Sequence, residues 1–204
     1  MISEENRKGL YGLVLAGGKS TRMGSDKTVM TWHGQEQRYY LADMLGELCE
    51  DVFISCRAEQ THDIANNYKV LTDQVEGKGP LGAILTAFNT YPDKAWLIIA
   101  SDLPLLDEET ISWLIDNRDP NCIATTFESP HDSLPEPLIT IWEPAAFEAI
   151  QSLFQENISC PRKVLMRNLE RVKIIKPNNP QALLNANTPD DAAQVIKLIQ
   201  HNHS

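Results

Sequence analysis

From about residue 10 to residue 126, short apolar runs alternate with segments whose apolar residues have helical spacing. The runs are nearly continuous in apolar residues and rich in valine, isoleucine and leucine, as strands covered on both faces are. They are Leu10–Leu15, Asp51–Cys56, Lys69–Leu71, Ala95–Ala100 and Cys122–Thr126. Strand and helix in turn predict an α/β fold, a Rossmann-like three-layer α/β/α sheet that is mostly parallel.

The segments between these runs carry their apolar residues on one stripe, which is typical of helices packed on a sheet. The stripes predict helices over Gln37–Cys49, Pro80–Tyr91 and Glu108–Asn117. Proline is favourable at the first helical position, and Asp107 stands where an N-cap belongs before the third helix.

The last third of the chain is less regular, because Pro130, Pro135 and Pro137 interrupt it. We expect a strand near Leu138–Trp142 that pairs antiparallel at the far side of the sheet, helices over Pro144–Gln155 and Arg162–Asn168, and a strand over Val172–Ile175. No repeat, low-complexity stretch or linker divides the chain, so a single domain over residues 1–204 is the simplest prediction.

The charge balance narrows the class of partner. A formal net charge of −10 and a pI near 4.9 argue against nucleic acid, because a phosphate backbone needs a basic surface. A single nucleotide is still compatible, since backbone N–H groups, one or two cations and a metal can hold a triphosphate. No apolar run approaches the roughly 20 residues that span a bilayer, and residues 1–8 lack the apolar core of a secretory signal. The expected location is the cytoplasm, without a membrane partner.

The four cysteines, Cys49, Cys56, Cys122 and Cys160, lie far apart and form no Cys-x-x-Cys pair. That spacing fits neither a zinc site nor a disulfide framework. We expect reduced thiols with a structural role, since the cytosol keeps thiols reduced. The five histidines have no ligand spacing and are expected at the surface.

A glycine-rich segment directly follows the first apolar run, and ligands bind at the carboxyl ends of strands in open parallel sheets. It reads Leu-Ala-Gly-Gly-Lys-Ser-Thr-Arg-Met-Gly-Ser-Asp-Lys over Leu15–Lys27. Gly17 and Gly18 permit positive φ and a close approach to the backbone, whose N–H groups can cradle phosphate oxygens. Arg22 and Lys27 add cations that suit a triphosphate. The spacing is neither a Walker A loop nor a dinucleotide fingerprint, so a glycine turn with two solvated cations stays an alternative.

The whole of Leu15–Lys27 closely resembles Leu-Ala-Gly-Gly-x-Ser-x-Arg-Met-Gly-x-Asp-Lys, the signature of the molybdenum cofactor guanylyltransferases. That family belongs to the nucleotidyltransferases built like the sugar-nucleotide pyrophosphorylases. Further segments are similar to the family's motifs and keep their order: Val70–Asp73, Gly79–Ile84, Ala100–Pro104, Glu136–Leu138 and Asn185–Pro189. The resemblance therefore extends over nearly the whole chain after residue 10.

The resemblance implies an enzyme that transfers GMP from GTP to molybdopterin bearing molybdenum and releases pyrophosphate. It implies Mg²⁺ as cofactor, with Asp102 as the metal ligand between the phosphates. The nucleotide-binding residues that it implies are Leu15, Ala16, Gly17, Gly18, Lys27, Asp73, Gly79, Pro80 and Asp102. Arg22, Lys27 and Asp102 are the implied catalytic residues, because this chemistry is mostly positioning and neutralisation of charge around the α-phosphorus.

Two of these carboxylates have simpler explanations. Asp102 ends a central strand, where a hard cation and a triphosphate are ligated, but an aspartate before a proline-bearing loop is also commonly a turn or cap residue. Asp73 can cap the turn through Gln74 and Val75. Ser55 stands where the family often has an asparagine near the nucleotide, so the resemblance carries no role over to it.

For the pterin substrate, the resemblance implies Arg162, Asn185 and Asn187 in the C-terminal third. Arg162, Lys163 and Arg167 are expected to form one cationic helix face, where the family has an arginine-bearing helix for the pterin phosphate. A solvated helix face is equally compatible, and the asparagines also suit capping of the final helix. The resemblance further implies transient contacts with other cofactor-biosynthesis proteins.

Three rival functions stay open. A cytidylyltransferase for the cytosine form of the cofactor more often carries Leu-Ala-Ala-Gly, whereas Gly17 and Gly18 give Ala-Gly-Gly here. A sugar-1-phosphate nucleotidyltransferase needs a sugar-binding insertion, for which 204 residues leave little room. A nucleotide-binding module without catalysis would be expected to lose Arg22, Lys27 or Asp102 first.

Overall fold

The computed structural model describes residues 4–16, 31–75 and 79–186, with residues 191, 193, 195, 197 and 198 beyond them. The final helix, which the sequence Thr188-Pro189-Asp190-Asp191 predicts, lies mostly outside the described residues. None of the helices in these ranges has both the length and the apolar character to cross a membrane.

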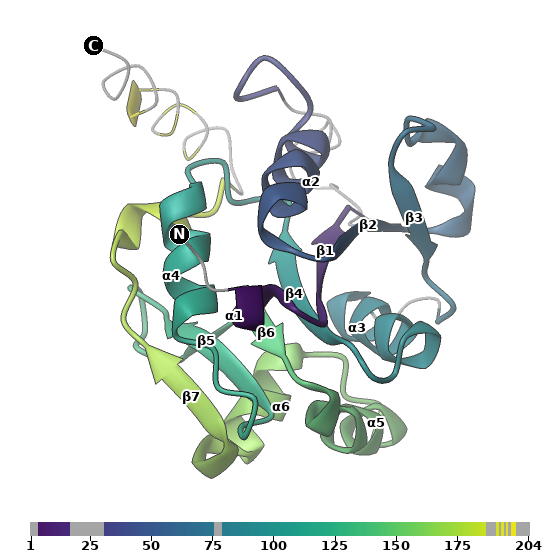
Figure 1. Ribbon diagram of the computed structural model, residues 1–204, viewed down its shortest axis with the longest axis vertical. Helices are drawn as coiled ribbons and strands as arrows, with labels where there is room; N and C mark the ends of the chain where they lie inside the picture. Colours follow the sequence, from purple (N-terminus) through teal and green to yellow (C-terminus); the bar gives the residue numbers. More distant parts are fainter. Residues whose placement is uncertain are drawn as a thin grey trace.

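Within the described ranges, seven strands form one sheet in the order β3-β2-β1-β4-β6-β5-β7 (Figure 1). The strands are β1 Leu10–Leu15, β2 Asp51–Cys56, β3 Lys69–Thr72, β4 Ala95–Ala100, β5 Ala124–Glu128, β6 Pro135–Trp142 and β7 Val172–Ile175. Strands β1 to β4 pair in parallel, as do β5 and β7, whereas β6 is antiparallel to both β4 and β5. The mostly parallel α/β sheet expected from the sequence is confirmed.

The position of β6 differs from the expectation. It lies between β4 and β5 and not at the far side of the sheet. Ile139, Ile141 and Trp142 are all 0 % exposed, and a strand that is apolar on both faces belongs in the covered middle of a sheet. The strand also begins earlier than expected, at Pro135, because proline is tolerated at the first residue of a strand. Strand β5 begins later, since the Cys122 N–H is used in a turn with the Asp119 carbonyl.

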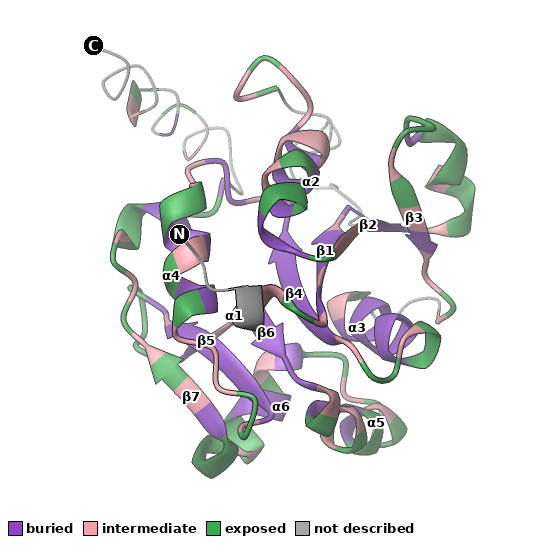
Figure 2. Cartoon of the chain, in the orientation of Figure 1, coloured by how far each residue is buried: buried purple, intermediate pink, exposed green. Residues whose placement is uncertain are grey.

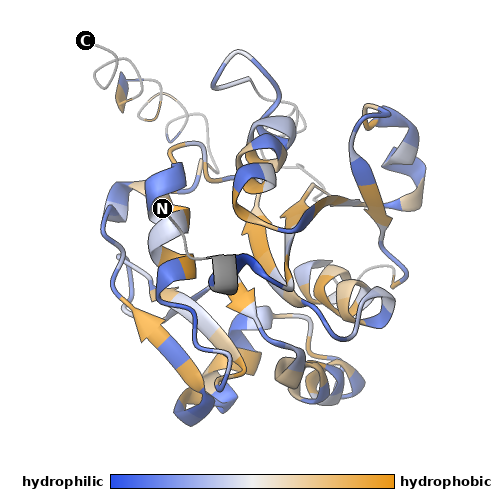
Figure 3. Cartoon of the chain, in the orientation of Figure 1, coloured by the Kyte–Doolittle hydropathy of each residue, from blue (hydrophilic) through white to orange (hydrophobic). Residues whose placement is uncertain are grey.

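Two layers of helices cover the sheet, and the strands between them are largely buried (Figure 2). One layer contains α2 (Gln37–Leu48) and α4 (Glu108–Asp116), and the other contains α3 (Gly79–Thr90), α5 (Phe147–Gln155) and α6 (Pro161–Arg167). The short elements are α1 (Glu4–Arg7) and the 3₁₀ turns Ala58–Asp63, Pro144–Ala146, Leu169–Arg171 and Pro180–Leu183. Successive side chains of β4 pack against opposite helix layers, with Leu97 in the core of the first layer and Trp96 in that of the second. Figure 3 shows the resulting apolar strands between polar outer helix faces.

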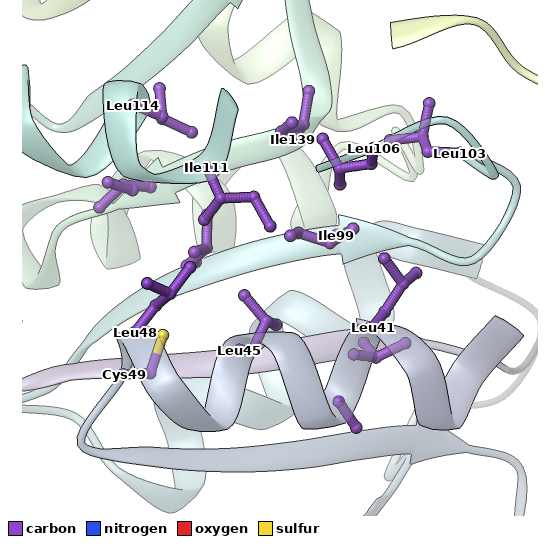
Figure 4. Close-up of a cluster of buried hydrophobic side chains, with 14 of the residues drawn as sticks. Leu41, Leu45, Leu48, Cys49, Ile99, Leu103, Leu106, Ile111, Leu114 and Ile139 are labelled. Carbon is purple, nitrogen blue, oxygen red and sulfur yellow. The ribbon is translucent and has the colours of Figure 1, made fainter. Parts of the chain in front are cut away.

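The first layer fixes the amino end of α2 against the sheet. Leu41 and Leu45 of α2 and Ile111 of α4 lie around Ile99 of β4 (Figure 4). All four side chains are fully buried, and burying such a side chain is worth about 1.5–3 kcal/mol. The loop that precedes α2 is thereby held close to the carboxyl end of β4.

All four cysteines are free thiols, as expected. Cys49 and Cys56 are buried, and burial raises the pKa of the Cys49 thiol to about 12. For His33 the expectation of a simple surface residue is wrong. Its ring stacks on Tyr40 with 4.0 Å between ring centroids, and its Nε2 lies 2.8 Å from the Pro104 carbonyl oxygen.

Candidate active site

The strand order places a topological switch point at the carboxyl ends of β1 and β4. The chain leaves β1 for β2 and β3 on one side and returns to β4 on the other, so the winding direction reverses between β1 and β4. Open α/β sheets bind ligands at such a switch point. Leu15 pairs with Ala100 in the β1–β4 ladder, so Ala16 and Asp102 follow strand ends that lie side by side.

Polar groups at the ends of β1, β2 and β3 are connected to one another. The N–H of the buried Ala16 donates to the Ser55 carbonyl at 2.9 Å, and the Ser55 hydroxyl donates to Asp73 Oδ1 at 2.6 Å. The Asp73 N–H donates to the Cys56 carbonyl at 3.0 Å. Burial raises the pKa of Asp73, while the Ser55 hydrogen bond and the Arg57 charge oppose that rise.

The loop after β4 is anchored from two sides. The Asp102 carbonyl accepts the Ala186 N–H at 2.9 Å, which brings the neighbouring Asn185 to the end of β4. The buried Gln37 of α2 donates its Nε2 hydrogen to the Leu103 carbonyl at 3.1 Å. Asp102 itself is half-buried. The carboxylate therefore stands on backbone that is fixed by two other parts of the chain.

Strand β6 brings a further carboxylate to this edge, because an antiparallel strand begins where its parallel neighbours end. The Glu136 carbonyl accepts the hydroxyls of Thr126 at 2.6 Å and Thr140 at 2.5 Å. The Glu136 side chain accepts a hydrogen bond from Arg162 at 3.3 Å, and Arg162 also donates to Asp132 at 2.7 Å. The guanidinium of Arg162 is thus held by two carboxylates.

This charged cluster faces the end of β4. Burial raises the pKa of Glu136, the Arg162 charge opposes the rise, and the negative charges of Asp132 and Asp102 add to it. The motif Glu136–Leu138 is apparent in the sequence, but nothing in the motif assigns a role to its carboxylate. Asp132 lies in an irregular polar stretch and has no sequence signal of its own.

The structure brings most of the described site residues together. Those at or beside the carboxyl edge are Leu15, Ala16, Asp73, Asp102 and Asn185. Gly79 and Pro80 begin α3 in the connection that follows β3, with Gly79 at φ +55°, a conformation that favours glycine. The remaining predicted site residues, Gly17, Gly18, Arg22, Lys27 and Asn187, lie outside the described residues.

The expected single cationic face on α6 is wrong. Arg167 donates to both carboxylate oxygens of Glu156, at 3.0 and 2.8 Å, whereas Arg162 is bound to Asp132 and Glu136. Positions five residues apart lie about 140° apart around a helix axis. Arg162 therefore points to the site cluster, while Arg167 lies on another side of the helix.

The donor set at the end of β4 suits a hard cation that is shared with a substrate. In the part of the chain that the structure describes, no three His, Cys, Asp or Glu side chains gather as a protein-only metal cage requires. Mg²⁺ is more often held by one or two carboxylates, water and substrate phosphates. The carboxylate of Asp102 and the amide oxygen of the exposed Asn185 are ligands of that kind.

Comparison with known proteins agrees with this geometry. Residues 12–172 match the family model described as MobA-like NTP transferase domain. A molybdenum cofactor biosynthesis bifunctional protein of Synechocystis sp. is 37% identical over 91% of this chain, which spans only 53% of that relative's length. The molybdenum cofactor guanylyltransferase of Pseudomonas fluorescens is 29% identical over 87% of this chain and 89% of its own length.

A solved structure shows the same fold. Molybdopterin-guanine dinucleotide biosynthesis protein A from Archaeoglobus fulgidus superposes with a TM-score of 0.78, at 20% identity, over 94% of this chain and 99% of its own. The matched residues 12–172 include the ends of strands β1 to β4 and the cluster around Glu136 and Arg162. The chain therefore belongs to the family of MobA-like NTP transferase domains.

Proposed function

We propose that this protein transfers GMP from GTP to molybdopterin bearing molybdenum. A phosphate oxygen of the pterin substrate attacks the α-phosphorus of GTP, a new phosphorus–oxygen bond forms, and the bond to the β-phosphate breaks as pyrophosphate leaves. The observation that carries the proposal is the meeting of Ala16, Asp73 and Asp102 at one sheet edge in a chain of this family. The name of the Pseudomonas fluorescens relative supports GTP and the molybdenum cofactor as substrates.

The nucleotide side of the site uses the parallel strands. The backbone of Leu15 and Ala16 begins the loop proposed to bind the triphosphate. Arg22 and Lys27 in the same loop supply two cations for the phosphate groups. Asp73 lies at the end of β3, two strands from β1, where its carboxylate accepts hydrogen bonds from the guanosine end. The distance between the end of β1 and the end of β3 separates phosphate binding from base or ribose binding.

Mg²⁺ is the proposed cofactor, with Asp102 as its protein ligand and Asn185 beside it. When bound, the cation neutralises charge on the triphosphate. Hydrogen bonds from the Ala186 N–H and the Gln37 side chain hold the loop that carries Asp102. The carboxylate therefore needs little reorganisation to bind the cation.

The pterin substrate is proposed to bind on the side of β6 and α6. Arg162 is the cation for its phosphate, and Asp132 and Glu136 hold the guanidinium in place before substrate arrives. Asn185 contributes an amide group next to Asp102, and Asn187, which lies outside the described residues, is proposed to contribute a second. No strong base is needed, because the attacking phosphate oxygen is already a nucleophile.

Nucleotide choice is tested first, by the thermal midpoint of the protein with GTP, CTP, ATP or UTP, each with and without Mg²⁺. A ligand that binds only the folded state adds about 2.7 kcal/mol at a hundredfold excess over Kd. GTP with Mg²⁺ is expected to give the dominant shift. A dominant shift with CTP or UTP would move the protein to a sister activity, and no shift with any nucleotide would contradict nucleotide transfer altogether.

Turnover is tested next, by pyrophosphate release from GTP in the presence of molybdopterin bearing molybdenum. Release should require both substrates, and omission of the pterin is the control. GTP binding without pyrophosphate release in the complete mixture would favour a nucleotide-binding module that lacks catalysis.

A further inference from the structure

Ser55 stands at the centre of the nucleotide side of the sheet. It belongs to β2, which lies between β1 and β3 (Figure 1), and it pairs with Leu15 on one side and Leu71 on the other. Its side chain is buried, with the residue 1% exposed. A buried serine in a strand must satisfy its hydroxyl within the protein, because an unpaired polar group costs free energy.

Both polar groups of Ser55 at this edge are used by nucleotide-binding elements. Its carbonyl accepts the Ala16 N–H at 2.9 Å, and its hydroxyl donates to Asp73 Oδ1 at 2.6 Å. The Asp73 N–H is fixed by the Cys56 carbonyl at 3.0 Å. Strand β2 therefore holds Asp73 by both its backbone and its carboxylate, while it also holds the first residue after β1.

The alternative role of Asp73 as a turn cap through Gln74 does not match these contacts. A cap would accept the N–H of Gln74 or Val75, but the Gln74 N–H donates to the Thr86 hydroxyl at 3.1 Å. The hydrogen bond that Asp73 accepts from a side chain comes from Ser55. The Asp73 carboxylate is thus oriented by strand β2, whereas the N–H of the next residue, Gln74, is bound by α3 through Thr86.

We propose that Ser55 is a positioning residue of the nucleotide site, which orients the Asp73 carboxylate toward the guanosine end and keeps it in register with Ala16. This inference rests on the proposed function, because it takes Asp73 as a contact of the nucleotide. Because Ser55 is only 1% exposed, it acts on the nucleotide through Asp73 and not by direct contact.

The groups around Asp73 make the effect of Ser55 on nucleotide affinity depend on pH. Burial raises the pKa of Asp73, whereas the Ser55 hydroxyl on β2 and the Arg57 guanidinium after β2 lower it. The Cys56 thiol is the other titratable group that senses this carboxylate, and its own pKa is raised by burial and by Asp73. Ser55→Ala removes one of the two groups that oppose burial among the described residues, so the pKa of Asp73 rises further. The acid limb of nucleotide affinity must then move to higher pH.

The experiment compares the Kd of GTP, CTP and ATP, with Mg²⁺, for the wild type and Ser55→Ala from about pH 5 to about pH 8. Ser55→Ala keeps the backbone bond to Ala16 and removes only the hydroxyl. The ratio of the two Kd values at each pH cancels the titration of the nucleotide's own phosphates. Thr125→Val is the matched control, because Thr125 is also fully buried and its hydroxyl accepts the Asp119 N–H at 3.0 Å in the α4–β5 connection, away from the nucleotide side.

Ser55→Ala is expected to raise the Kd of the preferred nucleotide about tenfold near neutral pH, as the loss of a hydrogen bond to a charged group does. The ratio should grow toward acid pH, Ser55→Thr should restore part of the affinity, and Thr125→Val should leave the ratio near one. A pH-independent ratio near one for folded Ser55→Ala would overturn the proposal. If the preferred nucleotide is CTP or ATP, the proposed function fails but the same ratio still tests Ser55, and binding of no nucleotide overturns both.

Discussion

Glu143→Ala is expected to lower the free energy of unfolding by about 3–5 kcal/mol, because it leaves a buried arginine without its partner. Arg118 and Glu143 form a fork-like ion pair with Nε–Oε1 at 2.6 Å and Nη2–Oε2 at 2.9 Å, and their side chains are 8% and 3% exposed. Arg118 also donates to the Asn6 carbonyl at 3.0 Å. The pair joins the segment before β1, the end of α4 and the end of β6.

The magnitude translates into a large change in melting temperature. For a domain of this size, 1 kcal/mol corresponds to about 2–4 °C, so a loss of about 6–20 °C is expected in calorimetry or thermal circular dichroism. Glu156→Ala is the comparison, because the Arg167–Glu156 pair is exposed at 49% and 47%. Exposed pairs contribute at most about 1 kcal/mol.

A double variant separates burial of charge from loss of contact. Arg118→Met with Glu143→Leu replaces both charges by apolar side chains and is expected to cost far less than the sum of the single changes. GTP binding by folded Glu143→Ala should match the wild type, since the pair lies at the edge opposite the site. A loss for Glu143→Ala no larger than that for Glu156→Ala would refute the argument from burial.

Three further predictions concern the site and the thiols. Asp102→Asn should remove the Mg²⁺-dependent part of the GTP thermal shift. It should also slow pyrophosphate release by about a hundredfold or more, because a bound metal stabilises the transition state by several kcal/mol. An unchanged Mg²⁺ dependence would exclude Asp102 as ligand. Arg162→Met should raise the KM for the pterin substrate at least about tenfold and leave GTP affinity unchanged. Arg167 pairs with Glu156 instead, so Arg167→Met should change neither quantity. Equal effects of both variants would contradict a specific role for Arg162. A thiol reagent at about pH 8 should modify the exposed Cys160 quickly and the buried Cys49 only after unfolding, because burial raises the Cys49 pKa to about 12. Mass spectrometry measures the labelling, and rapid labelling of Cys49 in the native protein would contradict its burial.

The strands with continuous apolar runs could be predicted from the sequence because such runs are stable only in a covered sheet. Strands β1, β2 and β4, which have such runs, have the predicted bounds. The place of β6 could not be predicted, because it depends on long-range pairs such as Trp96 with Trp142. Local patterns specify that a strand exists and which faces are apolar, but not which neighbour it pairs with.

The same distinction applies to the site. The places of Ala16 and Asp102 at the sheet edge could be predicted, because they lie one and two residues beyond the ends of apolar strands, where ligands bind in this class of fold. The partnership of Ser55 and Asp73 could not, because the two residues are 18 positions apart and meet only through the β2–β3 register. A place for the Glu136 carboxylate at this edge could not be predicted for a similar reason, because it depends on β6 being antiparallel and entering from the opposite direction.

The antiparallel strand also gives a reason for the place of Asp102, the proposed metal ligand. Strands β1, β2 and β3 carry the polar groups proposed for the nucleotide, whereas β6 and the α6 helix packed on it carry Glu136 and Arg162, proposed for the pterin side. In the described sheet, β4 is the strand that pairs with both β1 and β6. A cation that contacted both proposed substrates would lie where they meet, and in the described sheet the end of β4 is next to both sides. Asp102 stands there, and a carboxylate at the end of β2 or β3 would reach the nucleotide alone.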